Sequence, residues 1–136
     1  MMITTKGRYA LSIMLDLSLQ PADSYISLAR IAERQQISLK YLELIVAMLN
    51  KEGMVESMRG KRGGYRLTKA PSAYTVASII RLTERSIAPV SCLEGEVNSC
   101  EHAYNCLTLP MWEKLEKLID NYLESVTLQD LIDKQV

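Results

Sequence analysis

The stretch from Gln36 to Leu67, QISLKYLELIVAMLNKEGMVESMRGKRGGYRL, decides the fold of this chain. Ser38 is a residue type that caps helix starts, and the segment after it predicts a helix to about Glu52. Gly53 fits the end of that helix, because glycine adopts the left-handed backbone conformation without strain. The apolar residues of the helix recur at spacings of three and four and therefore share one face: Leu42, Ile45, Val46 and Leu49.

The second half of the stretch predicts a β-hairpin. Residues 54–58 and 65–67 have strand-like composition, and the turn between them reads Arg59-Gly60-Lys61-Arg62-Gly63-Gly64. Glycines let a main chain approach another molecule closely, and arginine or lysine can neutralise phosphates or enter a minor groove. The hairpin therefore predicts a wing that lies on a DNA backbone, in preference to a merely solvated basic turn.

A shorter predicted helix precedes the quoted stretch. Ser27 is placed to cap it, and Leu28, Ile31 and Ala32 follow at helical spacing. Two short helices joined by a tight turn, the second polar on its outer face, form a helix-turn-helix pattern. Together with the hairpin, this pattern predicts a winged helix-turn-helix.

The rest of the chain predicts helices around this motif. Apolar residues between Tyr9 and Leu19 fall on more than one helical face, which is typical of a central, buried helix. Further helices are predicted over residues 75–85, from Pro110 to about residue 122 or 124, and over residues 127–131. The predicted fold class is mainly α, with a small β-hairpin wing and a long C-terminal helix.

Length and charge narrow the class of protein. A chain of 136 residues fits one domain, or one domain with an appended dimerisation element. No apolar run approaches the roughly 20 residues that span a bilayer, and the N-terminus lacks a signal-peptide pattern, so we expect a cytoplasmic protein without membrane contact. Residues 1–70 carry 11 Lys and Arg against 6 Asp and Glu, whereas residues 71–136 carry 5 against 10. The basic first half indicates a polyanionic partner.

All three cysteines lie in one segment, spaced as Cys92-x7-Cys100-x5-Cys106, with the only histidine, His102, between the last two. In a reducing compartment, three thiols indicate a metal or redox site rather than a disulfide framework. Thiolates bind iron through soft Fe–S bonds, whereas structural zinc sites favour closely paired cysteines, which are missing here. The spacing alone leaves open an iron–sulfur site, a thiol switch and an accidental grouping.

The residue sets of common enzyme mechanisms are missing from the sequence. The chain has one histidine, no serine or cysteine nucleophile beside a credible base, and no phosphate-binding glycine loop after a strand. We therefore expect no enzymatic activity.

Several stretches carry a resemblance to a known family: Thr5-Lys6-Gly7-Arg8-Tyr9-Ala10, Glu33-Arg34-Gln35 with Ile37-Ser38-Leu39, Tyr41-Leu42-Glu43, Arg59-Gly60 with Gly63-Gly64-Tyr65, and Cys106-Leu107-Thr108 with Trp112. The chain resembles the winged-helix bacterial repressors that include the iron–sulfur cluster regulator IscR, the nitric-oxide sensor NsrR, the iron regulator RirA and the cysteine-metabolism regulator CymR. The resemblance covers nearly the whole chain and is strongest to the IscR type.

The resemblance implies a repressor of iron–sulfur cluster assembly genes that binds double-stranded promoter DNA as a homodimer. It implies a winged helix-turn-helix domain over residues 1–86, a cluster-binding loop over 87–109, and a dimerisation helix with a short last helix over 110–136. The implied DNA-binding residues are Ser38, Lys40, Tyr41, Glu43, Arg59, Gly60, Lys61, Arg62 and Tyr65. The implied dimerisation residues, on crossing C-terminal helices, are Trp112, Leu115, Leu118, Ile119 and Tyr122.

The resemblance also implies a [2Fe–2S] cluster held by Cys92, Cys100 and Cys106, with the iron–sulfur assembly machinery as its donor. Leu109 stands where IscR-type regulators have a histidine as fourth ligand, and the first cysteine gap is two residues longer, as in RirA. The fourth ligand must then come from elsewhere, and His102 is the first candidate. The other candidates are Glu101, Glu94, a residue of the other protomer, or a small molecule.

Three alternatives to the IscR-type function remain open from the sequence. The same cysteines can bind a [4Fe–4S] cluster in a regulator that senses nitric oxide or iron. The chain can be a metal-free, CymR-like repressor controlled by thiol oxidation or by a partner protein. It can also be an electron-transfer protein that binds no DNA.

Overall fold

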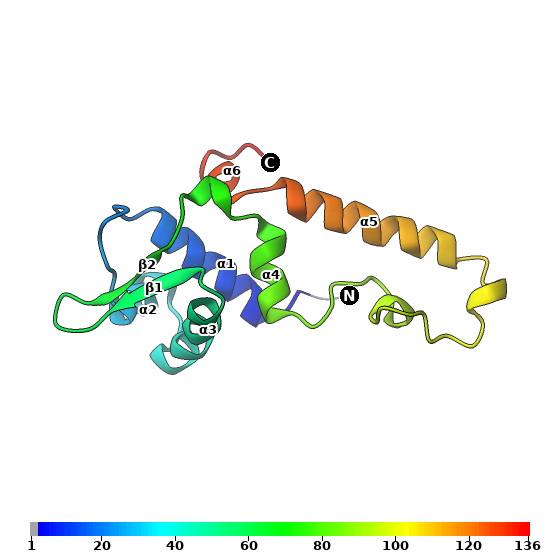
Figure 1. Ribbon diagram of the computed structural model, residues 1–136, viewed down its shortest axis with the longest axis horizontal. Helices are drawn as coiled ribbons and strands as arrows, with labels where there is room; N and C mark the ends of the chain where they lie inside the picture. Colours follow the sequence, from blue (N-terminus) through cyan, green and yellow to red (C-terminus); the bar gives the residue numbers. More distant parts are fainter. Residues whose placement is uncertain (1–2) are drawn as a thin grey trace.

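The computed structural model describes residues 3–136 and confirms the predicted fold class: the fold is mainly helical, with one small antiparallel hairpin that projects at one side (Figure 1). The chain order is α1 (Thr5–Ser18), α2 (Leu28–Gln35), α3 (Leu39–Lys51), β1 (Val55–Met58), β2 (Gly64–Leu67), η1 (Pro71–Ala73), α4 (Val76–Thr83), η2 (Ser91–Leu93), η3 (Ala103–Asn105), α5 (Leu109–Ser125) and α6 (Leu128–Ile132). The predicted helix over residues 75–85 is shorter by about a turn, because Glu84 already has extended backbone angles.

Helix α1 is the centre of the fold, as its multi-faced apolar pattern predicts. It contacts α2, α3, α4, β2 and α6, and its buried side chains include Ile13, Met14 and Leu17. The main core adds apolar residues from the neighbouring elements: Ile31, Ile37, Leu42, Ile45, Val46, Leu49, Val55, Ile79 and Leu128. Because α1 is covered on several sides, it fixes the positions of the two helices that follow it.

Helices α2 and α3 form the predicted helix-turn-helix. Both predicted caps are present, with Ser27 Oγ accepting from Arg30 N at 3.3 Å and Ser38 Oγ accepting from Tyr41 N at 3.2 Å. The turn between them passes through Gln36, which has φ of 54°. These caps satisfy N–H groups that a helix start otherwise leaves without partners.

A buried ion pair fastens α1 to α2. The Asp16 carboxylate, of which 4% is exposed, accepts from Arg34 Nη2 at 2.7 Å, Arg34 Nε at 3.0 Å and Gln35 Nε2 at 3.0 Å. Burial raises the pKa of Asp16, but the hydrogen bonds from Arg34 and Gln35 and the charge of Arg34 outweigh it, so the pKa lies below its ordinary value. This pair is not predictable from the sequence, because nothing in the sequence shows that residues 16 and 34 meet.

We expect Asp16→Asn to lower the free energy of unfolding by about 1–3 kcal/mol at neutral pH, because charged hydrogen bonds in a buried site are lost. A carboxyl with a lowered folded-state pKa stabilises the fold above its unfolded pKa of about 4, and this contribution disappears as the pH falls through the folded-state value. Urea unfolding at neutral pH and near pH 3 measures the difference, which should shrink in acid. The exposed Asp23→Asn is the matched control, and an equal loss at both pH values would contradict the ion pair's role.

The wing is anchored at its base by backbone pairing and by one phenol. β1 and β2 pair antiparallel from Val55 opposite Leu67 to Met58 opposite Gly64. Ile26 extends this sheet through two 2.8 Å hydrogen bonds with Tyr65. The buried Tyr74 hydroxyl donates to Met54 O at 2.8 Å and accepts from the N–H groups of residues 68 and 69, each at 3.0 Å. The wing therefore leaves the domain in a fixed direction.

The C-terminal helices return to the same domain. The cysteine-containing segment, residues 87–109, extends away from the winged part of the molecule, and α5 runs from the far end of that segment back toward α6 (Figure 1). After α5 the chain pairs with the start of α4, where Val76 N donates to Val126 O at 2.8 Å, and Leu128 is fully buried in the main core. Thr127 and Asp130 form a capping box that starts α6. Among residues 3–136, no helix has the length and apolar character that a membrane span requires.

Candidate nucleic-acid interface and cysteine segment

The first turn of α3 presents polar side chains to solvent. Ser38, Lys40 and Glu43 are exposed, whereas Leu42, Ile45, Val46 and Leu49 are buried beneath them. Tyr41 is half-buried, and its ring meets the Tyr9 ring edge-on with centroids 5.7 Å apart. Tyr41 therefore ties the start of α3 to α1, while the exposed residues remain available to a partner.

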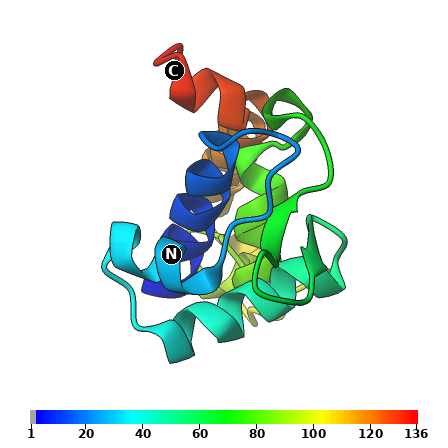
Figure 2. The same cartoon turned by 90° about the vertical axis from the view of Figure 1, so that its left-hand side faces the viewer.

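The cationic side chains of the wing tip are exposed to solvent. Arg59, Gly60, Lys61 and Arg62 are exposed, and none of the three cations forms an ion pair within residues 3–136. Gly60 has φ of +109°, which side-chain-bearing residues rarely adopt. Tyr65, in contrast, is half-buried and packs on the main core. The hairpin follows α3 and contacts it through β1, so the wing and α3 are neighbours in the fold (Figure 2).

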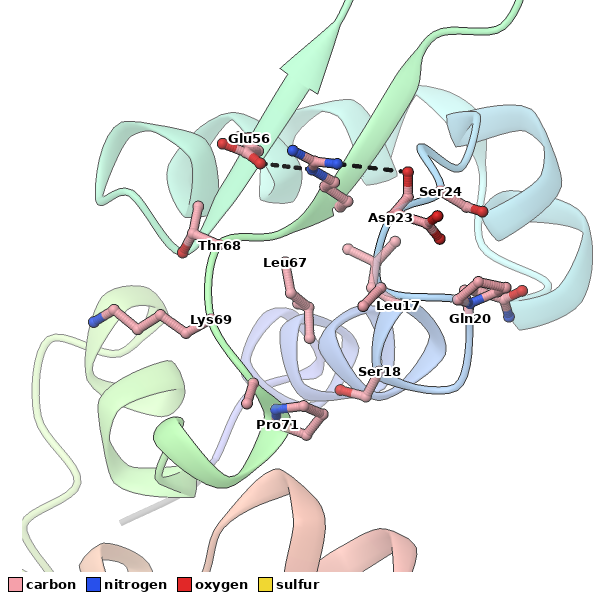
Figure 3. Close-up of a pocket in the computed structure, with 14 residues that line it drawn as sticks. Leu17, Ser18, Gln20, Asp23, Ser24, Glu56, Leu67, Thr68, Lys69 and Pro71 are labelled. Atoms are coloured by element: carbon pink, nitrogen blue, oxygen red, sulfur yellow. Dashed lines mark hydrogen bonds and ion pairs between the residues drawn. The ribbon is translucent and has the colours of Figure 1, made fainter.

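A brace holds the wing against the loop that follows α1. Arg66 Nε donates to Glu56 Oε1 at 2.6 Å, its Nη1 donates to Asp23 O at 3.5 Å, and its guanidinium lies 4.4 Å from the centre of the Tyr25 ring. The hydrogen bond to Glu56 contributes most to raising the pKa of Arg66, which stays charged. Figure 3 shows this brace at the edge of an open pocket that is floored by Leu17 and Leu67.

The three cysteines are free thiols on one irregular segment. Cys92 and Cys106 are half-buried, whereas Cys100 and His102 are exposed. No three Cys, His, Asp or Glu side chains among residues 3–136 converge on a common point that suits a metal ion. The structure therefore places the four predicted ligands on the same segment without bringing them together.

The donor set nevertheless fits an iron–sulfur cluster chemically. A hydrogen bond with the Thr108 hydroxyl, at 3.3 Å, is the largest of the effects that lower the pKa of Cys106, and backbone N–H groups at 108 and 109 add to it. Thiolates are the form that binds iron. The Asn98 Nδ2 atom in the same segment is buried without a hydrogen-bond partner among the described residues, so it is a donor that can still bind an acceptor. Leu109 is the first residue of α5 and offers no ligand atom.

Part of the cysteine segment lines a pocket together with the start of α3. Glu94 and Gly95, between the first two cysteines, line an open pocket together with Tyr41 and the first residues of α1. Glu84, at the end of α4, accepts from both Thr4 N at 2.9 Å and Thr4 Oγ1 at 2.6 Å, which fixes the other wall. This pocket therefore links the cysteine segment to the residues around the start of α3.

Helix α5 has two apolar faces with different surroundings. Ile119 and Leu123 pack on a second core formed by α4 and Val126, and Trp112 is half-buried. The other face, which we call the outer stripe, is solvent-exposed: Met111 54%, Leu115 37%, Leu118 58% and Tyr122 55%. The spacing of the outer stripe is that of a helix seam, and isolated large apolar stripes of this kind mark interaction surfaces. Of the predicted dimerisation residues, Leu115, Leu118 and Tyr122 lie on it.

A capped helix-turn-helix, a basic wing beside it and a long helix with an exposed apolar stripe define a winged helix-turn-helix DNA-binding regulator. The profile of the Rrf2 family, described as an iron-dependent transcriptional regulator, matches residues 3–134. The chain belongs to the Rrf2 family, and the family resemblance inferred from the sequence is confirmed.

Individual relatives agree with this family. The HTH-type transcriptional regulator IscR of Yersinia pseudotuberculosis is 41% identical over 135 residues, which cover 99% of this chain and 81% of that protein. Among solved structures, CymR, the global cysteine regulator of B. subtilis, is 36% identical with a TM-score of 0.80, covering 98% of both chains. T. potens IscR is 35% identical with a TM-score of 0.78, covering 100% of this chain and 89% of that one. The family and the IscR relative are transcriptional regulators, not enzymes.

Proposed function

We propose that this protein is a cytoplasmic repressor of iron–sulfur cluster assembly genes whose binding to promoter DNA depends on a [2Fe–2S] cluster. The observation that carries the proposal is the position of the cysteine segment, whose residues 94 and 95 share a pocket with Tyr41 of α3. The IscR-type relatives support the same assignment. The assembly machinery that makes such clusters is the donor, so the fraction of protein that carries a cluster would depend on how many clusters the machinery supplies.

Cys92, Cys100 and Cys106 would hold the cluster, and His102 is the proposed fourth ligand. Bound there, the cluster would supply a redox-active and chemically labile centre, since incomplete thiolate ligation raises the potential of iron–sulfur clusters. The protein's own part is to supply thiolates, with Cys106 favoured in that form by Thr108. The cysteine segment must also change conformation to bring the three thiols together, because they are separate in the structure.

On the DNA side, α3 would enter the major groove and the wing would follow the phosphate backbone. Ser38 and Lys40 lie at the start of α3, where contacts with base edges are made in this class. Glu43 can accept from cytosine N4 and repels phosphates when a poorly fitting sequence is bound. A dimer joined through the outer stripes of two α5 helices would read a two-fold symmetric operator.

We expect Arg59→Ala to weaken operator binding about tenfold, which is ~1.4 kcal/mol, and to reduce the slope of log affinity against log salt by about one. Operators are first recovered by binding of the wild-type protein to sheared genomic DNA, and affinities are then measured by fluorescence anisotropy over a range of salt. Lys114→Ala, which removes an exposed cation from α5, is the control and should change neither quantity. Unchanged affinity of Arg59→Ala would remove the wing from the interface, and recovery of no DNA would contradict the proposed function.

A metal-free thiol regulator is the second candidate. It is favoured by the exposed Cys100 thiol and by the separation of the ligands in the described chain. The similarity to CymR adds weight to it. Substitution of each cysteine by serine distinguishes the two functions. If the protein is a thiol regulator, the iron-free protein would bind its operators normally until it was oxidised.

A further inference from the structure

Asn98 differs from its neighbours in the cysteine segment. Its side-chain Oδ1 accepts from Cys100 N at 2.9 Å, which links it directly to the second predicted ligand. Its Nδ2 is the single buried side-chain nitrogen or oxygen without a hydrogen-bond partner among residues 3–136. The residues on either side are exposed, and Val97 is 81% exposed.

A buried amide without a partner is costly. Leaving such a donor unsatisfied destabilises a fold by about 1–3 kcal/mol, so native structures rarely keep one without a reason. The segment around Asn98 is irregular, so no helix or strand requires an amide at this position. The carbonyl half of the side chain already accepts from Cys100 N, so the two N–H groups of the amide are the part of the side chain left to bind another group.

We propose that Asn98 is a positioning residue for the cluster: its carbonyl oxygen orients Cys100, and its amide N–H donates to a sulfur of the bound cluster. This role rests on the proposed cluster-binding function. A hydrogen bond to sulfur stabilises the more negative, reduced form, so it raises the reduction potential, and such outer hydrogen bonds also fix ligand orientation. Asn98 would thus set how readily the centre is reduced, separately from the residues that hold it.

The test uses the full-length protein purified without oxygen. Asn98→Ala removes both the acceptor and the donor, whereas Asn98→Asp keeps the acceptor for Cys100 N–H and removes the donor. Asn105→Asp introduces the same charge at an exposed position of the same segment and is the matched control. The readouts are iron content, the reduction potential, and the shift of the Fe–S stretching bands when H₂O is exchanged for D₂O.

We expect both Asn98 variants to bind iron and to have a lower reduction potential. At a constant solution potential, the ratio of reduced to oxidised cluster should fall three- to tenfold. The D₂O-sensitive shift of one Fe–S band should be lost in both and kept in Asn105→Asp. Normal iron content with an unchanged potential and unchanged D₂O shift would overturn the role of Asn98 alone. Wild-type protein that binds no iron would overturn the proposed function as well. Circular dichroism confirms that each variant is folded.

Discussion

Leu118→Asp should convert the protein from a dimer to a monomer and abolish operator binding at concentrations where the wild type is saturated. Leu118 lies at the middle of the outer stripe of α5, and 58% of it is exposed in the single chain. Two-fold pairing through this stripe would bury both copies of the residue, so the variant would bury two carboxylates without partners. Each costs several kcal/mol, which is enough to weaken dimerisation by at least about a hundredfold.

Loss of the proposed dimer should remove DNA binding, because each protomer alone would read only one half of a two-fold symmetric operator. Two linked half-site contacts bind far more tightly than either one alone. Sedimentation velocity measures the mass, and circular dichroism should remain unchanged because Leu118 is outside both cores. Lys117→Asp, at an exposed neighbour that lies off the outer stripe, is the control and should remain dimeric. A Leu118→Asp protein of dimer mass would show that another surface joins the protomers.

Ile119→Asp is not an equivalent test. Ile119 packs against the second core of its own chain, so the substitution would destabilise the protomer itself. The sequence places Leu118 and Ile119 side by side on an amphipathic helix, and its periodicity does not tell which of two apolar faces the domain covers.

Gly64→Ala should detach the wing and destabilise the domain by about 2–4 kcal/mol, through strain and overpacking. Gly64 has φ of +152°, and a Cβ built there would lie 2.2 Å from the Ile26 carbonyl oxygen. The obstacle is backbone, so it cannot move aside as a flexible side chain does. Relief requires breaking the two hydrogen bonds between Ile26 and Tyr65 that hold the wing.

The effect of Gly64→Ala is measured by urea unfolding and by operator affinity, and both should fall. Gly95→Ala is the matched control for stability, because a Cβ at that position meets nothing closer than 3.5 Å and its φ lies outside the range that disfavours side chains. Stability equal to that of Gly95→Ala, or operator affinity equal to that of the wild type, would contradict the role of Gly64 in fixing the wing.

The local part of this fold is predictable from the sequence. Ser27 and Ser38 are caps by residue type and position, and the apolar spacing of α3 gives its buried face without any tertiary information. The glycines and cations of the wing tip are likewise local signals. These features depend on neighbours within four or five positions, which is the range that a sequence pattern reports.

The remainder depends on contacts between distant residues. The Asp16–Arg34 ion pair, the Tyr74 hydroxyl at the base of the wing and the pairing of Tyr65 with Ile26 all join separate elements. Tyr65 reads as a DNA contact beside the basic turn, but its half-buried ring packs on the core. Asn98 had no sequence signal, because an unpartnered buried amide exists only in three dimensions. The assembly of the cysteines around iron stays a prediction, since it requires a metal and a closed segment.

Iron and sulfide analysis with Mössbauer spectroscopy of protein purified without oxygen is the most direct test of cluster-dependent regulation. The measurement compares the wild type with Cys106→Ser, and the same samples are tested for binding to the recovered operators. We predict two irons and two sulfides per wild-type protomer, their loss in Cys106→Ser, and a changed operator preference in the iron-free protein. Four irons per protomer would point instead to a [4Fe–4S] sensor of nitric oxide or iron. Cluster-dependent regulation would be contradicted if the wild-type protein contained no iron and bound the operators with the same affinity as Cys106→Ser.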